Sequence, residues 1–395
     1  MEGQRYLKTH PWLSFVFDPG RLAPTDWMLL GEAQSKCLHV AGVPLKPAIS
    51  KEMHKVYLAK GALATTALEG NTLSEDQARK RLDGVLQLPP SKEYLGKEID
   101  NVITAFNFIL SAIHEGRGAT LSAGEILEYN RLALDNLEVE EGVVPGEVRT
   151  HPVGVGRYQC PEARDCPSLL GKYVAWLNEM HLVEGWEIAS GILKAIVAHI
   201  YLAWIHPFGD GNGRTARLIE YKILLSVGIP TPSAHILSNH YNQTRTQYYR
   251  ELDKASKSGG DVTSFIRYAL RGMVDGLKEQ LDNIRSQQWA ISWTDYIHER
   301  FKGQDTKAAV RRRRLMLDLS ERFDASVEIA RIPDISPRLA AEYHGATAKT
   351  YARDINVLVS MDLLEKKGKK IRARREAILA FLPHAYPASG PKSTP

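Results

Sequence analysis

The sequence predicts a mostly α-helical protein that has one small β-hairpin and a separate basic module near its C-terminal end. Apolar residues recur at helical spacing over long stretches, as Ala105, Ile109 and Ile113 illustrate. Glycines and prolines crowd residues 141–168 and exclude a long helix there. Residues 306–395 hold 18 Lys and Arg against 10 Asp and Glu, although the 395-residue chain has a net charge of only +5. Length and charge distribution together predict two or three domains.

The first part of the chain is expected to be an irregular segment followed by helices. Prolines interrupt residues 1–45, which predicts an irregular, partly ordered cover. A helix is predicted at about 50–70, and Gly70 suits a left-handed end of that helix. Ser74 stands three residues before Gln77, a capping-box spacing that predicts the start of the next helix.

The most informative stretch is residues 206–217, which read HPFGDGNGRTAR. The Gly-Asn-Gly of residues 211–213 allows a tight turn, and Arg214 opens an apolar segment with helical pattern. A glycine turn at a helix N-terminus binds anions, because the N–H groups of the first helical turn lack partners and the helix dipole favours negative charge. Arg214 and Arg217 share one face of that turn. Two guanidinium groups beside unpaired N–H groups predict a polyphosphate site.

Two more side chains of this stretch suit nucleotide chemistry. Asp210 offers the hard oxygen ligand that a Mg²⁺-nucleotide needs. His206 precedes it by four residues, and an ordinary histidine pKa lets the imidazole take a proton from a hydroxyl near neutral pH. The pattern therefore predicts a phosphate site that suits a Mg²⁺-nucleotide and has a potential base four residues before its carboxylate.

Residues 206–217 resemble the signature of the Fic family, His-Pro-Phe-x-Asp/Glu-Gly-Asn-Gly/Lys-Arg-x-x-Arg, and meet every fixed position. The usual activity in that family is transfer of AMP from ATP to a protein hydroxyl, and the resemblance covers about residues 50–270. It implies that His206 is the general base, that Asp210 holds Mg²⁺, and that Gly213 replaces the Lys of the kinase-like Doc branch. The ATP-binding residues that it implies are Val153, Gly154, Val155, Gly156, Asp210, Gly211, Asn212, Gly213, Arg214, Thr215, Ala216, Arg217, Tyr248 and Ser256.

A second motif lies in the helix predicted at about 50–70. Thr65 and Glu69 are four residues apart and share a helix face, which on local grounds describes a helix end with a solvated glutamate. Thr65-x-x-x-Glu69-Gly70 also resembles the inhibitory motif of Fic proteins, Ser/Thr-x-x-x-Glu-Gly/Asn, in the class whose inhibitory helix precedes the active-site motif. The resemblance implies that Glu69 pairs with Arg217 and occupies the place of the γ-phosphate.

The Gly- and Pro-rich region could fold as a short hairpin at residues 153–158 or as a plain surface loop. The resemblance implies a flap near 149–160, with a strand at residues 153–156. The hydroxyl-bearing segment of a target protein would dock on this flap by strand addition.

Several other segments have a structural interpretation. Ser122 has the spacing of a helix cap. The apolar run 188–205 is almost long enough to span a membrane, but it contains Lys194 and His199, which favours a buried core helix. The local pattern around Tyr248 equally suits core packing, and Ser256 stands where Fic proteins often have Asn. A helix is expected at residues 262–283, followed by a polar, mixed segment to about residue 307.

The C-terminal module has the order helix, glycine turn, helix, basic loop, which resembles a winged helix-turn-helix domain. Lys349, Arg353 and residues 366–375 could contact DNA phosphates, or the module could bind a protein. The expected domains are an N-terminal region with the inhibitory helix at 1–110, a Fic catalytic domain at 111–275, a helical linker at 276–309, a winged-helix-like domain at 310–385 and a tail at 386–395.

The three cysteines are few and odd in number, which favours a reducing compartment, and the first residues lack the pattern of a secretory leader, so we expect a cytoplasmic protein. We expect a protein adenylyltransferase that uses ATP with Mg²⁺, modifies a Ser, Thr or Tyr hydroxyl and is restrained by Glu69. A homodimer is compatible with the family, and no membrane partner is expected. The alternatives are removal of AMP from a modified protein, use of a different nucleotide or phosphodiester donor, and an ATP-sensing DNA-binding regulator.

Overall fold

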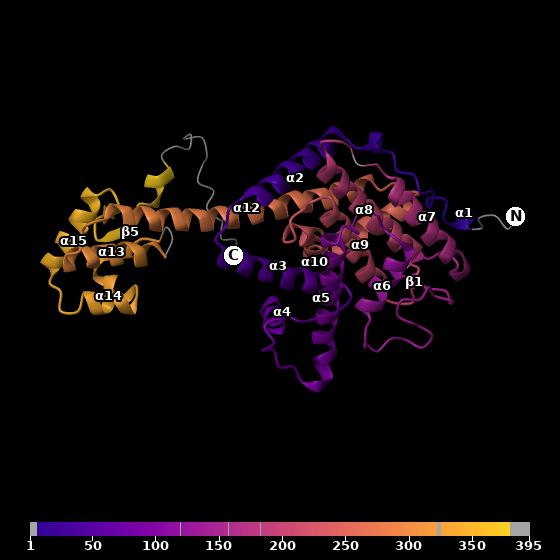
Figure 1. The fold of residues 1–395 in the computed structure, drawn as a ribbon, viewed down its shortest axis with the longest axis horizontal. Coiled ribbons are helices and arrows are strands. Elements are labelled where there is room, and N and C mark those ends of the chain that lie inside the picture. Colours follow the sequence, from indigo (N-terminus) through magenta and orange to yellow (C-terminus); the bar gives the residue numbers. More distant parts are fainter. Residues whose placement is uncertain (1–5, 119, 157, 182, 322–324, 380–395) are drawn as a thin grey trace. The chain divides into compact units, whose positions relative to one another are not determined.

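The computed structural model describes residues 6–118, 120–156, 158–181, 183–321 and 325–379. These residues are mostly helical, as predicted, and the chain divides into two compact units, residues 1–282 and 283–395 (Figure 1). Each unit has its own hydrophobic core. The division falls inside the long helix α12 (Thr263–Arg300) and within the residues expected to form a linker.

The first unit is a helical bundle that carries one two-stranded hairpin. Its helices besides the start of α12 are α1 (Tyr6–Thr9), α2 (Pro24–Gly42), α3 (Pro47–Ala67), α4 (Glu75–Leu82), α5 (Glu93–His114), α6 (Ala123–Ala133), α7 (Cys166–Glu179), α8 (Glu187–Ile205), α9 (Asn212–Ser226), α10 (Ile236–Gln243) and α11 (Arg245–Lys257), with short 3-10 turns at Pro19–Arg21, Pro90–Lys92, Ala163–Asp165 and Ser233–His235. The hairpin pairs β1 (Gly154–Val155) with β2 (Tyr158–Gln159) in antiparallel fashion.

Helices α8 and α9 form the centre of this unit, and α2, α3, α5, α6 and α7 pack around them (Figure 1). Within the described residues α8 is the one helix long and apolar enough to cross a membrane, and most of it is buried in the unit. This agrees with the prediction of a core helix, since an apolar surface on all sides requires neighbours on all sides. The central pair matters for function because the stretch 206–217 joins α8 to α9.

The predicted helix starts are confirmed at both capping boxes. Ser74 Oγ accepts from the Gln77 N–H at 3.2 Å while the Gln77 side chain accepts from the Ser74 N–H at 2.9 Å. Ser122 exchanges the corresponding bonds with Glu125. The hairpin expected at residues 153–158 is present but short, because only two residue pairs form its ladder.

Two expectations about secondary structure were wrong. The segment expected to be irregular contains α2, which Pro24 can begin because the first helical residue needs no N–H partner. The fully buried Asp26 fastens α2 to the bundle through paired bonds from Arg267 at 2.7 and 2.9 Å. Helix α12 continues through the segment expected to be mixed, because Trp293 and Ile297 lie one turn apart and enter the core of the second unit.

The second unit contains the end of α12, α13 (Lys307–Ser320), α14 (Pro337–Glu342) and α15 (Ala348–Ser360), with 3-10 turns at Ile329–Asp334 and Arg375–Leu379. A three-stranded antiparallel sheet of order β3-β5-β4 is formed by β3 (Val327–Glu328), β4 (Leu364–Lys367) and β5 (Lys370–Ala373). The element order fits the winged-helix interpretation, which stays a prediction.

Candidate active site

The stretch 206–217 folds as a tight loop between the two central helices. Helix α8 ends at Ile205, and His206 follows in the left-handed conformation with φ of 48°. A non-glycine residue in that conformation costs about 1–2 kcal/mol, so its surroundings must hold it. The buried Arg149 does so by donating from Nε to the His206 carbonyl at 2.8 Å, while its own N–H donates to the Pro207 carbonyl.

Asn212 shapes this loop from inside. Its side-chain oxygen accepts from the Phe208 N–H at 3.0 Å, and its amide nitrogen donates to the Phe208 carbonyl at 2.8 Å. The family resemblance places Asn212 among the ATP-binding residues, but both ends of its amide are engaged by Phe208. Gly211 then adopts φ of 78° and α9 begins, which leaves the N–H groups of the first turn for an anion.

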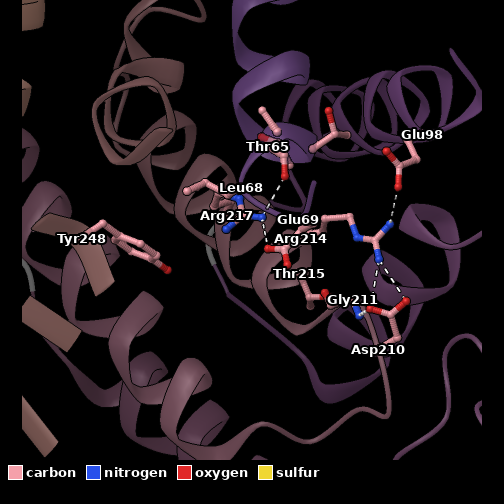
Figure 2. A network of polar contacts seen from close by, with 12 residues as sticks. Thr65, Leu68, Glu69, Glu98, Asp210, Gly211, Arg214, Thr215, Arg217 and Tyr248 are labelled. Atoms are coloured by element: carbon pink, nitrogen blue, oxygen red, sulfur yellow. Dashed lines mark hydrogen bonds and ion pairs between the residues drawn. The ribbon is translucent and has the colours of Figure 1, made fainter. Parts of the chain in front are cut away.

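The buried Arg217 meets the helix predicted to be inhibitory. Its Nη2 donates to Glu69 Oε1 at 2.5 Å and to the Thr65 carbonyl at 2.8 Å (Figure 2). Thr65 thus contributes its backbone, because its hydroxyl donates to the Gly61 carbonyl. Gly70, with φ of 112°, lets the chain turn directly after Glu69.

The Glu69 carboxylate lies directly over the N-terminal turn of α9. A Cβ placed on Gly213 would overlap Glu69 Oε1 and would stand 3.1 Å from Arg217 Nη1, so only glycine leaves this space open. Burial raises the pKa of Glu69, but the charge and hydrogen bond of Arg217 more than offset it, and the pKa lies below its ordinary value. An ionised carboxylate therefore occupies the anion site that the sequence predicted.

The second arginine of the motif bridges two acidic groups. Arg214 Nη2 lies 3.0 and 3.1 Å from the carboxylate oxygens of Asp210, and its Nη1 lies 3.5 Å from Glu98 (Figure 2). Among the described residues, the Nε atoms of Arg214 and Arg217 are buried without a hydrogen-bond partner. These two orphaned donors are a feature that a bound phosphate would satisfy.

Asp210 fits a magnesium ion that is held chiefly by a nucleotide. Its side chain is 45% exposed, and Mg²⁺ commonly takes one or two carboxylates together with phosphate oxygens and water. No cluster of three or more potential metal-ligating side chains occurs in the part of the chain that the structure describes. An ion at Asp210 would therefore draw its remaining ligands from ATP and solvent.

His206 is only partly exposed, and burial lowers its pKa to about 4. This is well below the ordinary value on which the sequence prediction relied. The Nδ1 atom lies 3.3 Å from the Ala203 carbonyl, which favours the tautomer that carries its proton on Nδ1. Nε2 is then the unprotonated nitrogen at neutral pH.

Tyr248 is buried rather than open to a ligand, with 4% of its surface exposed. Its hydroxyl lies 2.8 Å from His199 Nε2, and His199 Nδ1 lies 3.0 Å from Glu220 Oε2. Glu220 also accepts from the Tyr241 hydroxyl at 2.8 Å. The core-packing alternative thus describes the ring well, and the exposed tyrosine of α11 is the neighbouring Tyr249.

The remaining predicted site residues differ in their burial and in their hydrogen bonds. Thr215 and Ala216 are fully buried in α9, and the Thr215 hydroxyl donates to the Gly211 carbonyl at 2.8 Å. Ser256 donates within α11 to the Asp253 carbonyl at 2.9 Å. Residues 153–156 belong to the hairpin and its edge, of which Gly154, Val155 and Gly156 are exposed.

Two residues that support the loop were missed in the sequence. Arg149 also donates to the carbonyls of His151 and Pro161, at 2.9 and 2.6 Å, and so ties both ends of the predicted flap to the motif. Asn130 donates to the Asp210 carbonyl at 2.9 Å and accepts from the Gly146 N–H at the same distance. Both act on backbone atoms, which have no residue-specific signal in a single sequence.

Known proteins share sequence with the part of the chain that contains this site. Residues 120–224 match the family model described as Fic/DOC family. The chain is 31% identical over 227 residues to protein adenylyltransferase fic-1 of Caenorhabditis elegans, covering 56% of this chain and 42% of that protein. It is 30% identical over 204 residues to protein adenylyltransferase Fic of Drosophila melanogaster, covering 52% and 38%. The chain thus spans less than half the length of these curated relatives.

Solved structures share the fold. A Fic family protein from Desulfovibrio desulfuricans G20 superimposes with a TM-score of 0.56 at 20% identity, covering 91% of this chain and 98% of that one. Fic-1 from C. elegans superimposes with a TM-score of 0.52 at 26% identity, covering 66% and 73%. The motif, the fold and the matched segment agree, and the chain is therefore a Fic domain protein.

Proposed function

We propose that this protein transfers AMP from ATP to a Ser, Thr or Tyr hydroxyl of a target protein, and that its own Glu69 restrains the reaction. One observation carries the proposal: the anion site at the start of α9 is filled by the Glu69 carboxylate, paired with the buried Arg217 at 2.5 Å. A site that binds a carboxylate in this way can bind a phosphate in its place. The names of the relatives as protein adenylyltransferases support the same reaction.

The reaction would be an in-line displacement at the α-phosphorus of ATP. The target hydroxyl oxygen forms a bond to that phosphorus, and the bond to the bridging oxygen breaks, so pyrophosphate leaves. His206 Nε2, unprotonated at neutral pH, would take the hydroxyl proton as the new bond forms. A Mg²⁺ ion held with the help of Asp210 would supply charge neutralisation on the phosphates when bound.

Glu69 would restrain the reaction because its carboxylate competes with the γ-phosphate of ATP for the same place. The γ-phosphate and the Glu69 carboxylate would both need the Nη2 atom of Arg217 and the open space over Gly213. With Glu69 seated, a triphosphate can bind only in a displaced pose, which does not align the α-phosphorus with an incoming hydroxyl. The target segment would add to the hairpin near residues 149–160, whose first strand is exposed.

A second candidate is removal of AMP from a modified protein. Its support is the lowered pKa of Glu69, because an ionised carboxylate beside the phosphate site could orient a water molecule for attack. In that reaction Glu69 would be required, whereas in AMP transfer its removal would increase the rate. The two proposals therefore predict opposite effects of one substitution.

The test uses ATP labelled on the α-phosphate, Mg²⁺ and cell lysate, with the parent, Glu69→Gly and Glu69→Gly/His206→Ala proteins. Thr72→Gly, an exposed loop position, controls for added backbone freedom. We expect strong protein label only with Glu69→Gly, and loss of that label by a factor of roughly 10²–10⁴ when His206 is also replaced. Label in no lane, with ATP binding intact, would overturn the proposal and favour AMP removal or a regulatory role.

A further inference from the structure

The outer surface of the second unit is strongly basic along one helix and one turn. We infer that this unit binds duplex DNA, with α15 in the major groove and the β4–β5 turn on the phosphate backbone. The inference does not rest on the proposed AMP transfer, because all of its residues lie in the second unit.

The exposed face of α15 has the residue types that read DNA. Lys349, Arg353 and Asn356 are exposed and follow each other at steps of four and three residues, so they lie in a row about 10 Å long. Together with Ala352, Val357 and Ser360 they line a shallow, open depression. Small neighbours such as Ala352 let another surface come close to the helix axis.

The single acidic residue of α15 points away from this face. Asp354 is fully buried and pairs with Arg311 at 2.7 Å and with Arg312 at 2.8 Å. The Tyr343 hydroxyl also donates to it at 3.2 Å. The exposed face of α15 therefore carries positive charge that no carboxylate of its own helix offsets.

Some arginines of the second unit form ion pairs inside the unit, whereas other basic residues remain available to bind a partner. The arginine run opening α13 is largely used inside the unit, because Arg311 and Arg312 bind Asp354 and Arg314 binds Glu342. Arg338, Arg372 and Arg374 are likewise paired with acidic side chains. Among the described residues no carboxylate lies within ion-pair distance of Lys349, Arg353, Lys366, Lys369 or Lys370.

The unpaired lysines gather at a tight turn that follows α15. Lys367 pairs with Lys370 across the β4–β5 ladder, so the turn consists of Gly368 and Lys369, and Gly368 has φ of 61°. Lys366 and Lys370 are exposed beside it. Helix α15 packs against β4, the strand that leads directly into this turn.

Duplex DNA fits this surface better than the other polyanions. The major groove of B-form DNA is about 12 Å wide and admits a helix, whose Lys or Arg can bind guanine and whose Asn can bind adenine. The major groove of A-form RNA is too narrow for side chains on a helix to read. The lysine turn offers point charges for phosphates, which position a protein without reading sequence.

The experiment measures anisotropy of a fluorescent 24-base-pair duplex (about two helical turns) with the full-length protein as salt is varied. We expect affinity to fall steeply with salt, and the slope of log affinity against log salt to lessen by about 0.9 for each phosphate that a variant no longer neutralises. Lys366→Ala/Lys369→Ala/Lys370→Ala should reduce that slope, and Lys349→Ala/Arg353→Ala should weaken binding at every salt concentration.

The control is Lys51→Ala/Lys92→Ala, which removes two exposed cations from the first unit and should bind as the parent does. Melting curves establish that each variant is folded. The inference is overturned if the parent does not bind duplex DNA at low salt, or if both sets of variants bind like the control. Equal affinity for double-stranded RNA or for an acidic polypeptide would refute docking of α15 in the major groove.

Discussion

Replacing Glu69 by glycine should lower the thermal stability of the protein without ATP and increase the stabilisation that ATP provides. Among the residues that the structure describes, Glu69 is the one carboxylate in contact with Arg217, whose side chain is 1% exposed, and the substitution removes it. The Thr65 carbonyl stays as a neutral acceptor at 2.8 Å. Arg217 is then a buried cation without a carboxylate in contact, which is the costly way to break an ion pair.

The size of the effect follows from this geometry. Removing one partner of a fully buried pair costs about 3–5 kcal/mol, and because the Glu69 side chain is 32% exposed, solvent reduces that to about 1–3 kcal/mol. For a unit of this size, each kcal/mol corresponds to roughly 2–4 °C, so the melting temperature should fall by roughly 2–12 °C. By mass action, ATP at a hundred times its Kd should stabilise the folded variant by about 2.7 kcal/mol. Its phosphates would take the place of the lost carboxylate beside Arg217.

The assay is a thermal melt of the parent, Glu69→Gly and Thr72→Gly proteins, each with and without Mg²⁺ and ATP. The parent should gain less from ATP than Glu69→Gly does, because ATP must displace Glu69 or bind beside it. Thr72→Gly should behave as the parent does. The reasoning is refuted if Glu69→Gly melts at the parental temperature without ATP, or if ATP raises the melting temperature of both proteins equally.

Three further predictions concern residues around the site. Arg149→Met removes the three carbonyl contacts of the guanidinium and should speed amide hydrogen exchange across residues 150–161, while exchange in α12 stays unchanged. His199→Phe leaves the Glu220 carboxylate short of a partner and should cost about 2–4 kcal/mol in urea denaturation; adding Glu220→Gln should recover part of it in a double-mutant cycle. Burial lowers the pKa of His235 to about 3, so from pH 6.5 downward its imidazole binds a proton in the unfolded chain but not in the folded chain. Stability should therefore fall by up to about 1.4 kcal/mol per pH unit from this residue, and the fall should be shallower in His235→Asn at pH 4–6.5.

The sequence predicts this protein well where function depends on short spacings. The loop at 206–217 was readable because a glycine turn, two arginines and a helix start lie within twelve residues. The Glu69–Arg217 contact joins positions 148 residues apart, so no local pattern could indicate it, and only the resemblance of the short motif to a known inhibitory sequence did.

Other features were out of reach for physical reasons. Arg149 and Asn130 bond to backbone atoms, and a backbone carbonyl looks the same at every residue. The pKa of His206 depends on burial by elements far away in the chain, which an ordinary histidine pKa ignores. Helix α2 was hidden by prolines, although Pro24 is a favourable first helical residue.

The position of Gly213 links the proposed catalysis to the proposed restraint. A side chain there would overlap the Glu69 carboxylate, so the residue type that opens α9 to a phosphate also opens it to the inhibitory glutamate. Arg217 is likewise buried and needs an anion in either state. The site cannot be strengthened for ATP at these two positions without being strengthened for Glu69. If Glu69 restrains the reaction as proposed, an activating signal would act on the far side of the contact, by moving the turn after α3 that carries Glu69, rather than on the phosphate site itself.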